Sequence, residues 1–260
     1  MNLITSRDNP LFKKIQRLSK DGAAYRKLGL VWIEGDHLCR AAIERGLKPI
    51  HAVFSESLWK RTSIEWISCA ENNVVLSTSL FSEISGLESP ANIGFVLSFQ
   101  QTHEIQANTP TIVLDRLQDT GNVGSILRSA SAFGFKQVLA LKGTASLWSP
   151  KVLRAGMGAH FGLHLVESLT IEQLKQLDTP WLATSVHDGP FLHQLLADSQ
   201  LPMPCAWLLG HEGQGVSPQL LDRAALSVRI EQPGGEESLN VAAAAAICLH
   251  ASATQRHSKF

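Results

Sequence analysis

Glycine and polar residues that could form a binding site are concentrated in three stretches of the second half of this 260-residue sequence. They run from Asp115 to Gly134, from Gly210 to Ser217 and from Ile230 to Val241, and each begins where a β-rich run ends. Glycine lets the backbone approach a ligand closely or adopt a positive φ. Because the carboxyl ends of parallel strands line the ligand crevice of an α/β sheet, the three stretches predict a binding site at that edge.

The common phosphate, hydrolase and metal motifs are missing. The loop from Gly210 to Gly215 has the spacing GxxGxG and comes late, whereas a dinucleotide fingerprint needs GxGxxG after the first strand. Neither GxxxxGK[ST], HExxH nor GxSxG occurs. The nearest metal-like pair, His160 and His164, lacks an adjacent glutamate, and the four cysteines lie far apart. We therefore predict no metal site and no Rossmann-type nucleotide site, and mostly buried, reduced thiols.

Taken together, the three stretches resemble the motifs of the SpoU-type (TrmH-like) RNA 2′-O-ribose methyltransferases of the SPOUT superfamily. Asn122 to Arg128 matches the pattern N-x-G-x-x-x-R, Leu209 to Gly215 matches L-G-x-E-x-x-G, and Ser238 to Val241 matches S-L-N-V, in the family's order. The first half resembles the family's accessory RNA-binding domain more loosely, through a basic N-terminal segment and a strand ending in Ile33, Glu34 and Gly35.

The resemblance implies transfer of a methyl group from S-adenosylmethionine to a ribose 2′-hydroxyl of structured RNA, with rRNA favoured over tRNA, by a homodimer. It also implies a trefoil knot, in which the segment from about Leu208 to the end passes through a loop, an exception to the rule that chains avoid knots. The cofactor is then held in the knot, mainly by backbone groups. The residues expected around it are Thr184, Leu209, Gly210, Gly215, Ile230 and Leu239.

The resemblance assigns catalysis to the polar motif residues Arg128, Asn122, Glu212, Ser238 and Asn240. A ribose hydroxyl is a weak nucleophile, so its proton must be removed or its oxygen oriented. Family descriptions give the base role to Arg128, but a guanidinium is essentially always protonated. Arg128 could instead bind the phosphate beside the target ribose and position the hydroxyl.

Four of these residues also have a purely structural interpretation. Arg128 could be a solvated helix arginine, and Glu212 could be a solvent-facing loop acid. Asn122 and Ser238 could be helix N-caps, a common use of those residue types.

The chain departs from the family pattern beside the expected cofactor pocket. Glu231 and Gln232 stand where the family has Pro-Met, and Gly156 stands where its middle segment has serine. Since all five polar motif residues are present, we expect an active enzyme. The alternative is a catalytically silent RNA-binding or ribosome-assembly protein with the same fold.

Two series of alternating strands and helices predict two α/β domains. Residues 30–99 form the first series and residues 111–253 the second, in which near-continuous apolar runs such as Cys205 to Leu209 favour a parallel sheet. The polar segment 101–110 is the predicted linker. We expect a smaller N-terminal RNA-binding domain over residues 1–100 and a knotted methyltransferase domain over residues 111–260.

The charge is unevenly distributed, although the chain has 23 basic and 23 acidic residues. The first 30 residues hold seven basic and two acidic side chains, a balance of +5 that leaves −5 on the rest. Such a segment fits contact with a polyanion, and a solvated amphipathic helix from Asn9 to Lys20 is the alternative. For Trp32, Trp59 and Trp66, core packing is favoured over base stacking. The candidate RNA contacts are Arg7, Lys13, Lys14, Arg17, Arg26 and Lys27.

Composition sets the class of protein. With 44% apolar and 18% charged residues, the chain can fill a core, which excludes a disordered tail, a coiled coil and a collagen-like chain. Its longest apolar run, Val241 to Leu249, is far shorter than the roughly 20 residues that span a bilayer. The N-terminus lacks the apolar region of a signal peptide, so we expect a cytoplasmic protein without a membrane segment.

Overall fold

A computed structural model describes residues 3–87, 89–234 and 238–257, with the side chains of residues 256 and 257 excepted. The chain forms two compact units. The first comprises Met1–Gln101 and Trp148–Phe161, and the second comprises Thr102–Leu147 and Gly162–Phe260. A short segment from the second half of the sequence therefore belongs to the first unit.

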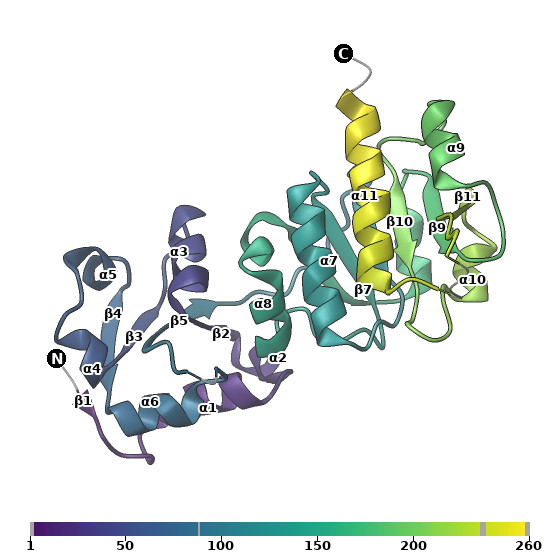
Figure 1. Ribbon diagram of the computed structural model, residues 1–260. Coiled ribbons are helices and arrows are strands. Elements are labelled where there is room, and N and C mark those ends of the chain that lie inside the picture. Colours follow the sequence, from purple (N-terminus) through teal and green to yellow (C-terminus); the bar gives the residue numbers. More distant parts are fainter. Residues whose placement is uncertain (1–2, 88, 235–237, 258–260) are drawn as a thin grey trace. The chain divides into compact units, whose positions relative to one another are not determined.

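The first unit contains a five-stranded mixed sheet with the strand order β1-β4-β3-β5-β2 (Figure 1). Strands β1, β4 and β3 are parallel, whereas β5 is antiparallel to both β3 and β2. The strands are β1 (Leu3–Ile4), β2 (Leu30–Glu34), β3 (His51–Ser55), β4 (Asn72–Leu76) and β5 (Ile93–Ser98). The helices that accompany them are α1 (Pro10–Lys20), α2 (Ala24–Leu28), α3 (Asp36–Glu44), α4 (Glu56–Trp59), α5 (Ile64–Ser68) and α6 (Thr78–Ile84).

Helix α1 is the amphipathic helix predicted at the N-terminus. The Asn9 side chain accepts hydrogen bonds from two backbone N–H groups of the first turn, and proline occupies the first helical position. Phe12, Ile15 and Leu18 lie three residues apart and are buried in the core of the unit. The basic side chains of the helix are thereby left on its exposed face.

Helix α8 (Pro150–Gly156) is the segment that joins the first unit from the second half of the sequence. It begins at Ser149, whose hydroxyl caps the helix, and it packs against α1 and β2. Leu153 is part of the core of this unit. Three tryptophans also pack in this core: Trp32 is buried, and Trp59 and Trp66 are partly buried. The prediction of core packing is therefore confirmed.

The second unit contains a six-stranded sheet with the order β11-β9-β10-β6-β7-β8, and every pair in it is parallel. This confirms the parallel sheet predicted from the apolar runs. The strands are β6 (Thr111–Leu114), β7 (Gln137–Leu141), β8 (His164–Leu169), β9 (Trp181–Ser185), β10 (Ala206–Leu209) and β11 (Leu226–Arg229). The α-helices of the unit are α7 (Thr120–Ala132), α9 (Leu192–Ala197), α10 (Pro218–Leu221) and α11 (Val241–His257), and a 3-10 segment lies at Ile171–Gln176. A second 3-10 segment, Ala159–Gly162, lies where the chain passes from the first unit back to the second.

Strands β6 and β10 meet at the centre of this sheet, and the chain leaves them in opposite directions. From β6 it continues to β7 on one side, whereas from β10 it continues to β11, which lies beyond β9 on the other side. Leu114 pairs with Leu209 at the ends of the two strands. A reversal of this kind opens a crevice at the carboxyl ends of the two strands, where ligands of open α/β sheets bind.

Helices α7 and α11 pack against each other alongside the sheet (Figure 1). Gly124 of α7 and Ala245 of α11 are buried, and the rings of Phe133 and His250 meet edge to face at 5.4 Å. Small residues allow the helices to approach closely. Of the segment expected to form the knot, residues 235–237 and 258–260 lie outside the described residues.

The four cysteines are free thiols, of which Cys39, Cys205 and Cys248 are buried and Cys69 is partly buried. Burial raises the pKa of Cys205 and of Cys248 to about 12, so both remain protonated and unreactive at neutral pH. None of the helices in the described part of the chain has the length and apolar character that a membrane span requires.

Candidate active site

Glu212 joins the loop that follows β10 to the start of α7. One of its carboxylate oxygens accepts a hydrogen bond from the backbone N–H of Asp119 at 3.0 Å, and the other accepts from Gln118 at 3.2 Å. The side-chain amide of Asn122 also donates to Glu212, at 3.4 Å. The first and second sequence motifs therefore meet at the crevice between β6 and β10.

Asn240 brings the third motif to the same place. Its side-chain amide donates to the side-chain oxygen of Asn122 at 3.0 Å, so Asn240, Asn122 and Glu212 form a continuous chain of hydrogen bonds. The three residues are separated by up to 118 positions in the sequence. Their convergence shows that the three stretches form one polar site.

The helix N-caps at this site are not the residues that the structural interpretation suggested. Asp119 caps α7 by accepting from the backbone N–H of Asn122 at 2.7 Å. Asn240 caps α11 by accepting from the N–H groups of Ala242 and Ala243. The cap interpretation of Asn122 and Ser238 was therefore wrong, and the Asn122 side chain is left for the polar network.

Gly210 is required by the tight path of the loop after β10. A Cβ atom at this position would lie 2.0 Å from both the carbonyl carbon of Gly215 and the nitrogen of Val216. Gly215 itself has a φ of +68°, which glycine adopts without strain. The loop is closed by an isolated bridge between His211 and Gly215. The two glycines of the second motif thus shape a loop whose own backbone lies at the site.

The sequence model of the SpoU rRNA methylase family matches residues 109–250, which include all three motifs. This chain belongs to the SpoU rRNA methylase family.

Similarity to known proteins covers most of the chain. The 23S rRNA (guanosine(2553)-2′-O)-methyltransferase RlmP of Bacillus subtilis (strain 168) is 29% identical over 222 residues, which cover 84% of this chain and 86% of that protein. A protein of Synechocystis sp. named as an uncharacterized tRNA/rRNA methyltransferase is 29% identical over 277 residues, which cover 97% of this chain and 94% of that protein. The crystal structure of an RNA 2′-O ribose methyltransferase superposes with a TM-score of 0.80 at 27% identity, covering 98% and 100%.

Most of the residues expected around the cofactor lie at one edge of the sheet of this SpoU chain. Thr184, Leu209 and Ile230 stand at or just beyond the ends of the neighbouring strands β9, β10 and β11, and Gly210 follows Leu209. Leu209 and Gly210 are buried, and the Thr184 hydroxyl donates to the carbonyl of Leu208 at 3.2 Å.

The edge also carries groups suited to a polar ligand. The side-chain oxygen of Gln232 is buried and has no hydrogen-bond partner among the described residues, two positions after Ile230. Leu239 is 39% exposed. An unpartnered oxygen and an exposed aliphatic side chain near the strand ends fit a ligand with both polar and apolar parts, such as S-adenosylmethionine.

Arg128 is not connected to the polar network. It lies on α7 six residues after Asn122 and is exposed, and in the described part of the chain its guanidinium has no hydrogen-bond or ion-pair partner. Ser238 is likewise exposed and precedes α11. The structure thus brings Asn122, Glu212 and Asn240 together and leaves Arg128 and Ser238 turned to solvent.

Hydrogen bonding determines the ionisation of Glu212. Burial by itself would raise the pKa of this carboxyl, but the backbone N–H groups of Asp119, Glu212 and Gln118 and the amide of Asn122 together lower it below its ordinary value. Glu212 is therefore a carboxylate at neutral pH, and its negative charge stands at the crevice.

The candidate RNA contacts lie in the first unit, and several of them are paired with acids. Arg7 forms an ion pair with Glu83 at 2.6 Å, Lys13 with Asp8 at 2.8 Å, and Arg17 with Asp21 at 3.9 Å. All of these pairs are solvent-exposed, so each contributes little to stability and can be exchanged for another anion. Lys14 and Lys27 are exposed and have no ion pair with a described residue, and Arg26 lies over the ring of Tyr25 at 4.9 Å.

Metal-ligating side chains are not grouped at the site. Within the described ranges no three histidine, cysteine, aspartate or glutamate residues are placed to hold a metal ion. His160 is buried beside Trp148 in the first unit, whereas His164 begins β8 in the second and bonds to the carbonyl of Glu104 at 2.8 Å.

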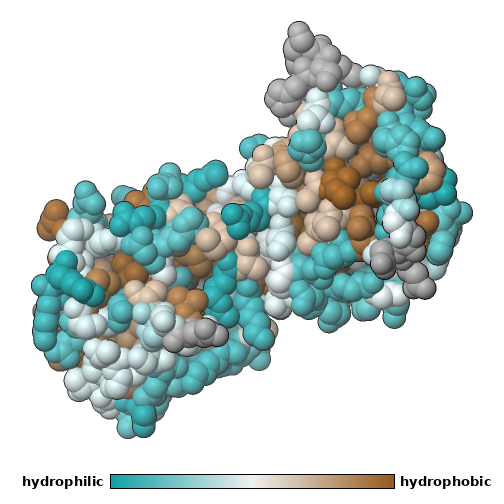
Figure 2. Space-filling model, in the orientation of Figure 1, coloured by the Kyte–Doolittle hydropathy of each residue, from teal (hydrophilic) through white to brown (hydrophobic). Residues whose placement is uncertain are grey.

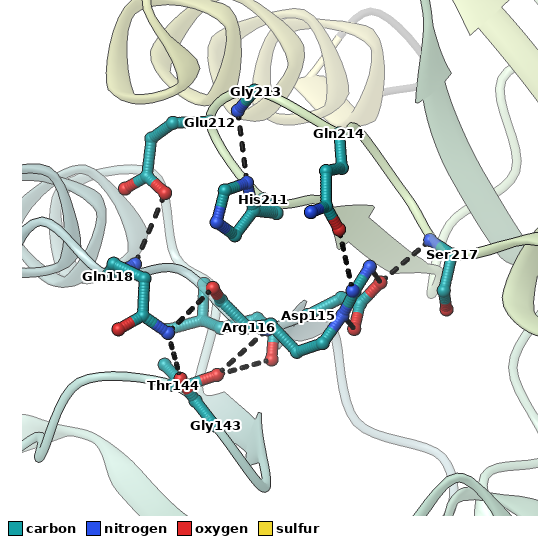
Figure 3. A network of polar contacts seen from close by, with 11 residues as sticks. Asp115, Arg116, Gln118, Gly143, Thr144, His211, Glu212, Gly213, Gln214 and Ser217 are labelled. Carbon is teal, nitrogen blue, oxygen red and sulfur yellow. Dashed lines mark hydrogen bonds and ion pairs between the residues drawn. The ribbon is translucent and has the colours of Figure 1, made fainter.

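Sequence reasoning missed two charged residues at the centre of the network in Figure 3, Asp115 and Arg116. They follow β6 directly, and Arg116 contacts both Asp115 and Gln214. The available signal was an adjacent acid and base at the end of an apolar strand, within a stretch already singled out for its glycine and polar residues.

Proposed function

We propose that this chain transfers a methyl group from S-adenosylmethionine to a ribose 2′-hydroxyl of structured RNA, with rRNA as the favoured substrate. The observation that supports this most directly is the hydrogen-bonded chain of Asn240, Asn122 and Glu212, which joins the three SpoU motifs at the crevice of the parallel sheet. Relatives that cover most of the chain are named RNA 2′-O-methyltransferases.

The cofactor is held by the carboxyl edge of β9, β10 and β11. We assign its contacts to backbone groups at Leu209, Gly210 and Gly215, with Thr184, Ile230 and Leu239 beside them. When bound, S-adenosylmethionine would supply an electrophilic methyl group on a positively charged sulfur; the ribose oxygen would take the methyl group and lose its proton to solvent, and the sulfur would leave as the neutral thioether S-adenosylhomocysteine. Glu212, Asn122 and Asn240 keep the surrounding loops in place.

We assign Arg128 to positioning of the target nucleotide. Its guanidinium is exposed and has no partner among the described residues, so it can form two parallel hydrogen bonds with a phosphate. Holding the phosphate beside the target ribose brings the 2′-hydroxyl to the methyl group, and an effect of this kind requires no change in protonation. Ser238, exposed at the start of the third motif, is assigned to the same nucleotide-facing side.

A second copy of the chain completes this proposal. Figure 2 shows hydrophobic residues gathered over α11 on the exposed face of the second unit, and Ile247 of this helix is 41% exposed. A homodimer through α11 would cover this surface. The first unit, with its basic N-terminal segment, is assigned to RNA binding, and the cytoplasm is the compartment in which we expect the reaction.

The function is tested by two measurements. Calorimetric titration with S-adenosylmethionine is expected to show binding by the purified protein, and 2′-O-methyl mapping of total RNA is expected to show a site that is lost from cells without it. Arg128→Ala is expected to abolish methyl transfer with cofactor affinity nearly unchanged. A protein that binds RNA but neither binds the cofactor nor changes the methylation map would instead be the catalytically silent alternative.

A further inference from the structure

Arg116 connects the ends of two neighbouring strands of the second unit (Figure 3). It follows β6, and its guanidinium donates to the Asp115 carboxylate at 2.9 Å and to the side-chain oxygen of Gln214 at 3.0 Å. Gln214 lies in the loop from Gly210 to Ser217, which also carries Glu212. One side chain therefore links the β6 end to the middle of the loop after β10.

Asp115 fixes the far end of the same loop. Only 1% of this residue is exposed, and one of its carboxylate oxygens accepts the backbone N–H of Ser217 at 2.7 Å. A buried carboxylate needs a cationic or hydrogen-bonding partner, and Arg116 supplies the charge. The ion pair and the Ser217 bond together form a clamp, which we define as Asp115, Arg116, Gln214 and Ser217.

The backbone of Arg116 is itself held in an unusual conformation. Its φ is +62°, a value that residues other than glycine rarely adopt. Its N–H donates to the hydroxyl of Thr144 at 3.1 Å, and its carbonyl accepts from the Gln118 side chain at 3.3 Å. Gln118 also bonds to the carbonyl of Gly143. Such backbone strain persists only where the surroundings enforce it, and it occurs most often at functional sites.

We propose that Arg116 is a positioning residue for cofactor binding, which acts by holding the Gly210–Ser217 loop in its binding conformation before the cofactor arrives. This inference rests on the proposed function. Within the clamped loop, Glu212 reaches the N–H groups of Gln118 and Asp119, and Gly210 stays in contact with Gly215. A loop that is already ordered loses less conformational freedom on binding, so the clamp raises affinity without touching the reacting atoms.

Gln214→Leu is the most informative variant, because it breaks the link to the loop and leaves the buried Asp115 carboxylate paired with Arg116. Arg116→Lys is the second variant, since a lysine ammonium cannot serve Asp115 and Gln214 through a planar fork. Arg223→Lys is the matched control. The Arg223 side chain is 38% exposed, against 36% for the Arg116 side chain. The ion pair of Arg223 with Glu172 involves neither the Gly210–Ser217 loop nor the β6–α7 connection.

The experiment combines three measurements on the full-length protein. Titration with S-adenosylmethionine is expected to give a dissociation constant about tenfold higher for Gln214→Leu. This is the change expected if the loop of the variant adopts its binding conformation in only about a tenth of the molecules. The turnover rate at saturating cofactor is expected to match the wild type. Hydrogen exchange without cofactor is expected to be faster at the amides of residues 213–217, with no change in the rest of the second unit or in Arg223→Lys.

The possible results separate this inference from the proposed function. Unchanged affinity and unchanged exchange in both Gln214→Leu and Arg116→Lys would overturn the positioning role. A lower turnover rate with unchanged affinity would also overturn it, because Arg116 would then act on the reacting groups. Failure of the wild type to bind S-adenosylmethionine would overturn the proposed function, and the exchange rates would then decide whether Arg116 holds the loop.

Discussion

Glu212 accepts hydrogen bonds from two backbone N–H groups of the β6–α7 connection and from the side chain of Asn122. These donors are suited to a carboxylate and poorly suited to a neutral acid, because a protonated carboxyl turns one oxygen into a donor. The lowered pKa of Glu212 follows from this mismatch. The ionised side chain therefore stabilises the folded loop, and the free energy of folding must depend on pH through this residue.

Glu212→Gln is expected to remove one pH-dependent contribution to stability. The pKa of Glu212 is lower in the folded chain than in the unfolded chain, where glutamate titrates at about 4.3. The stabilisation is therefore complete above that pH and is lost as the pH falls through the folded-state pKa. Urea unfolding between pH 3 and 7 measures the unfolding free energy of both proteins. The difference between wild type and variant should become smaller as the pH falls.

Glu44→Gln is the control for this measurement, since Glu44 is an exposed acid of α3. It is expected to have no comparable effect. A difference between wild type and Glu212→Gln that is constant over the pH range would show that the ionisation of Glu212 does not support the loop.

The polar centre of the site could be predicted at the residue level, but its charged support could not. Asn122, Glu212 and Asn240 belong to motifs with fixed spacing, and the structure brings the three together. Arg116 belongs to no such motif, and its backbone at positive φ donates a hydrogen bond to Thr144, which lies 28 positions further along the chain. A conformation enforced by tertiary contacts leaves no local signal in the sequence.

Among the strands, most were predicted from their apolar runs, including the edge strands β2 and β11, whereas the edge strand β8 and the two-residue β1 were not. Strands β6, β7 and β10 are near-continuous apolar runs, whereas β8 at the edge of the sheet contains Glu167 and Ser168. Glu167 is nevertheless buried and accepts the N–H of Leu147 at 2.7 Å. A charged residue can be buried in a strand when a neighbouring loop donates a hydrogen bond to it. Such a residue interrupts the apolar pattern from which a buried strand is predicted.

The position of helix α8 also could not be predicted. Its sequence indicates a helix, but its packing onto α1 and β2 depends on Leu153 fitting the core of the first unit. Periodicity predicts which face of a helix is buried and does not predict which sheet covers it.

Gly210→Ala is expected to open the loop after β10. The added methyl group would lie 2.0 Å from backbone atoms of Gly215 and Val216, and backbone cannot move aside as a flexible side chain can. We expect a loss of about 1–3 kcal/mol of unfolding free energy, typical of overpacking, and a marked loss of cofactor affinity. Denaturant unfolding and calorimetric titration measure the two effects.

Gly213→Ala provides the matched control in the same loop. The nearest atoms to an added Cβ there belong to the His211 ring, at 3.9 and 4.0 Å, so the methyl group has room. We expect the unfolding free energy to change by less than about 0.5 kcal/mol and the cofactor affinity to equal that of the wild type. Equal effects of the two substitutions would show that loop flexibility, rather than the contact at Gly210, decides binding.

At the scale of the whole molecule, the proposed dimer makes a simple prediction about mass. Ile247→Glu places a charge on the exposed face of α11, where Ile247 is 41% exposed, and is expected to convert a dimer into a monomer. Leu221→Glu, at a site 38% exposed on α10, is the control and is expected to remain dimeric. Light scattering at micromolar concentration distinguishes the two, and a wild-type protein that is already monomeric would contradict the dimer.

The distribution of charge predicts how the whole molecule binds RNA. Exposed ion pairs occupy Arg7, Lys13 and Arg17, whereas Lys14 and Lys27 have no ion pair with a described residue and are available for phosphates. Each phosphate contact releases counterions, so the logarithm of the binding constant falls with the logarithm of salt concentration by roughly 0.7–0.9 per contact.

A Lys14→Ala, Lys27→Ala double variant is therefore expected to weaken RNA binding regardless of sequence and to reduce the salt slope by about 0.7–0.9 for each lost contact. S-adenosylmethionine binding should be unchanged, because both lysines belong to the first unit and the cofactor edge belongs to the second. Lys175→Ala, which removes an exposed lysine paired with Glu172 in the second unit, is expected to leave the slope as it is. RNA affinity measured at several salt concentrations decides the matter. If the double variant keeps the wild-type slope and affinity, these basic side chains serve solubility and the RNA contacts lie elsewhere.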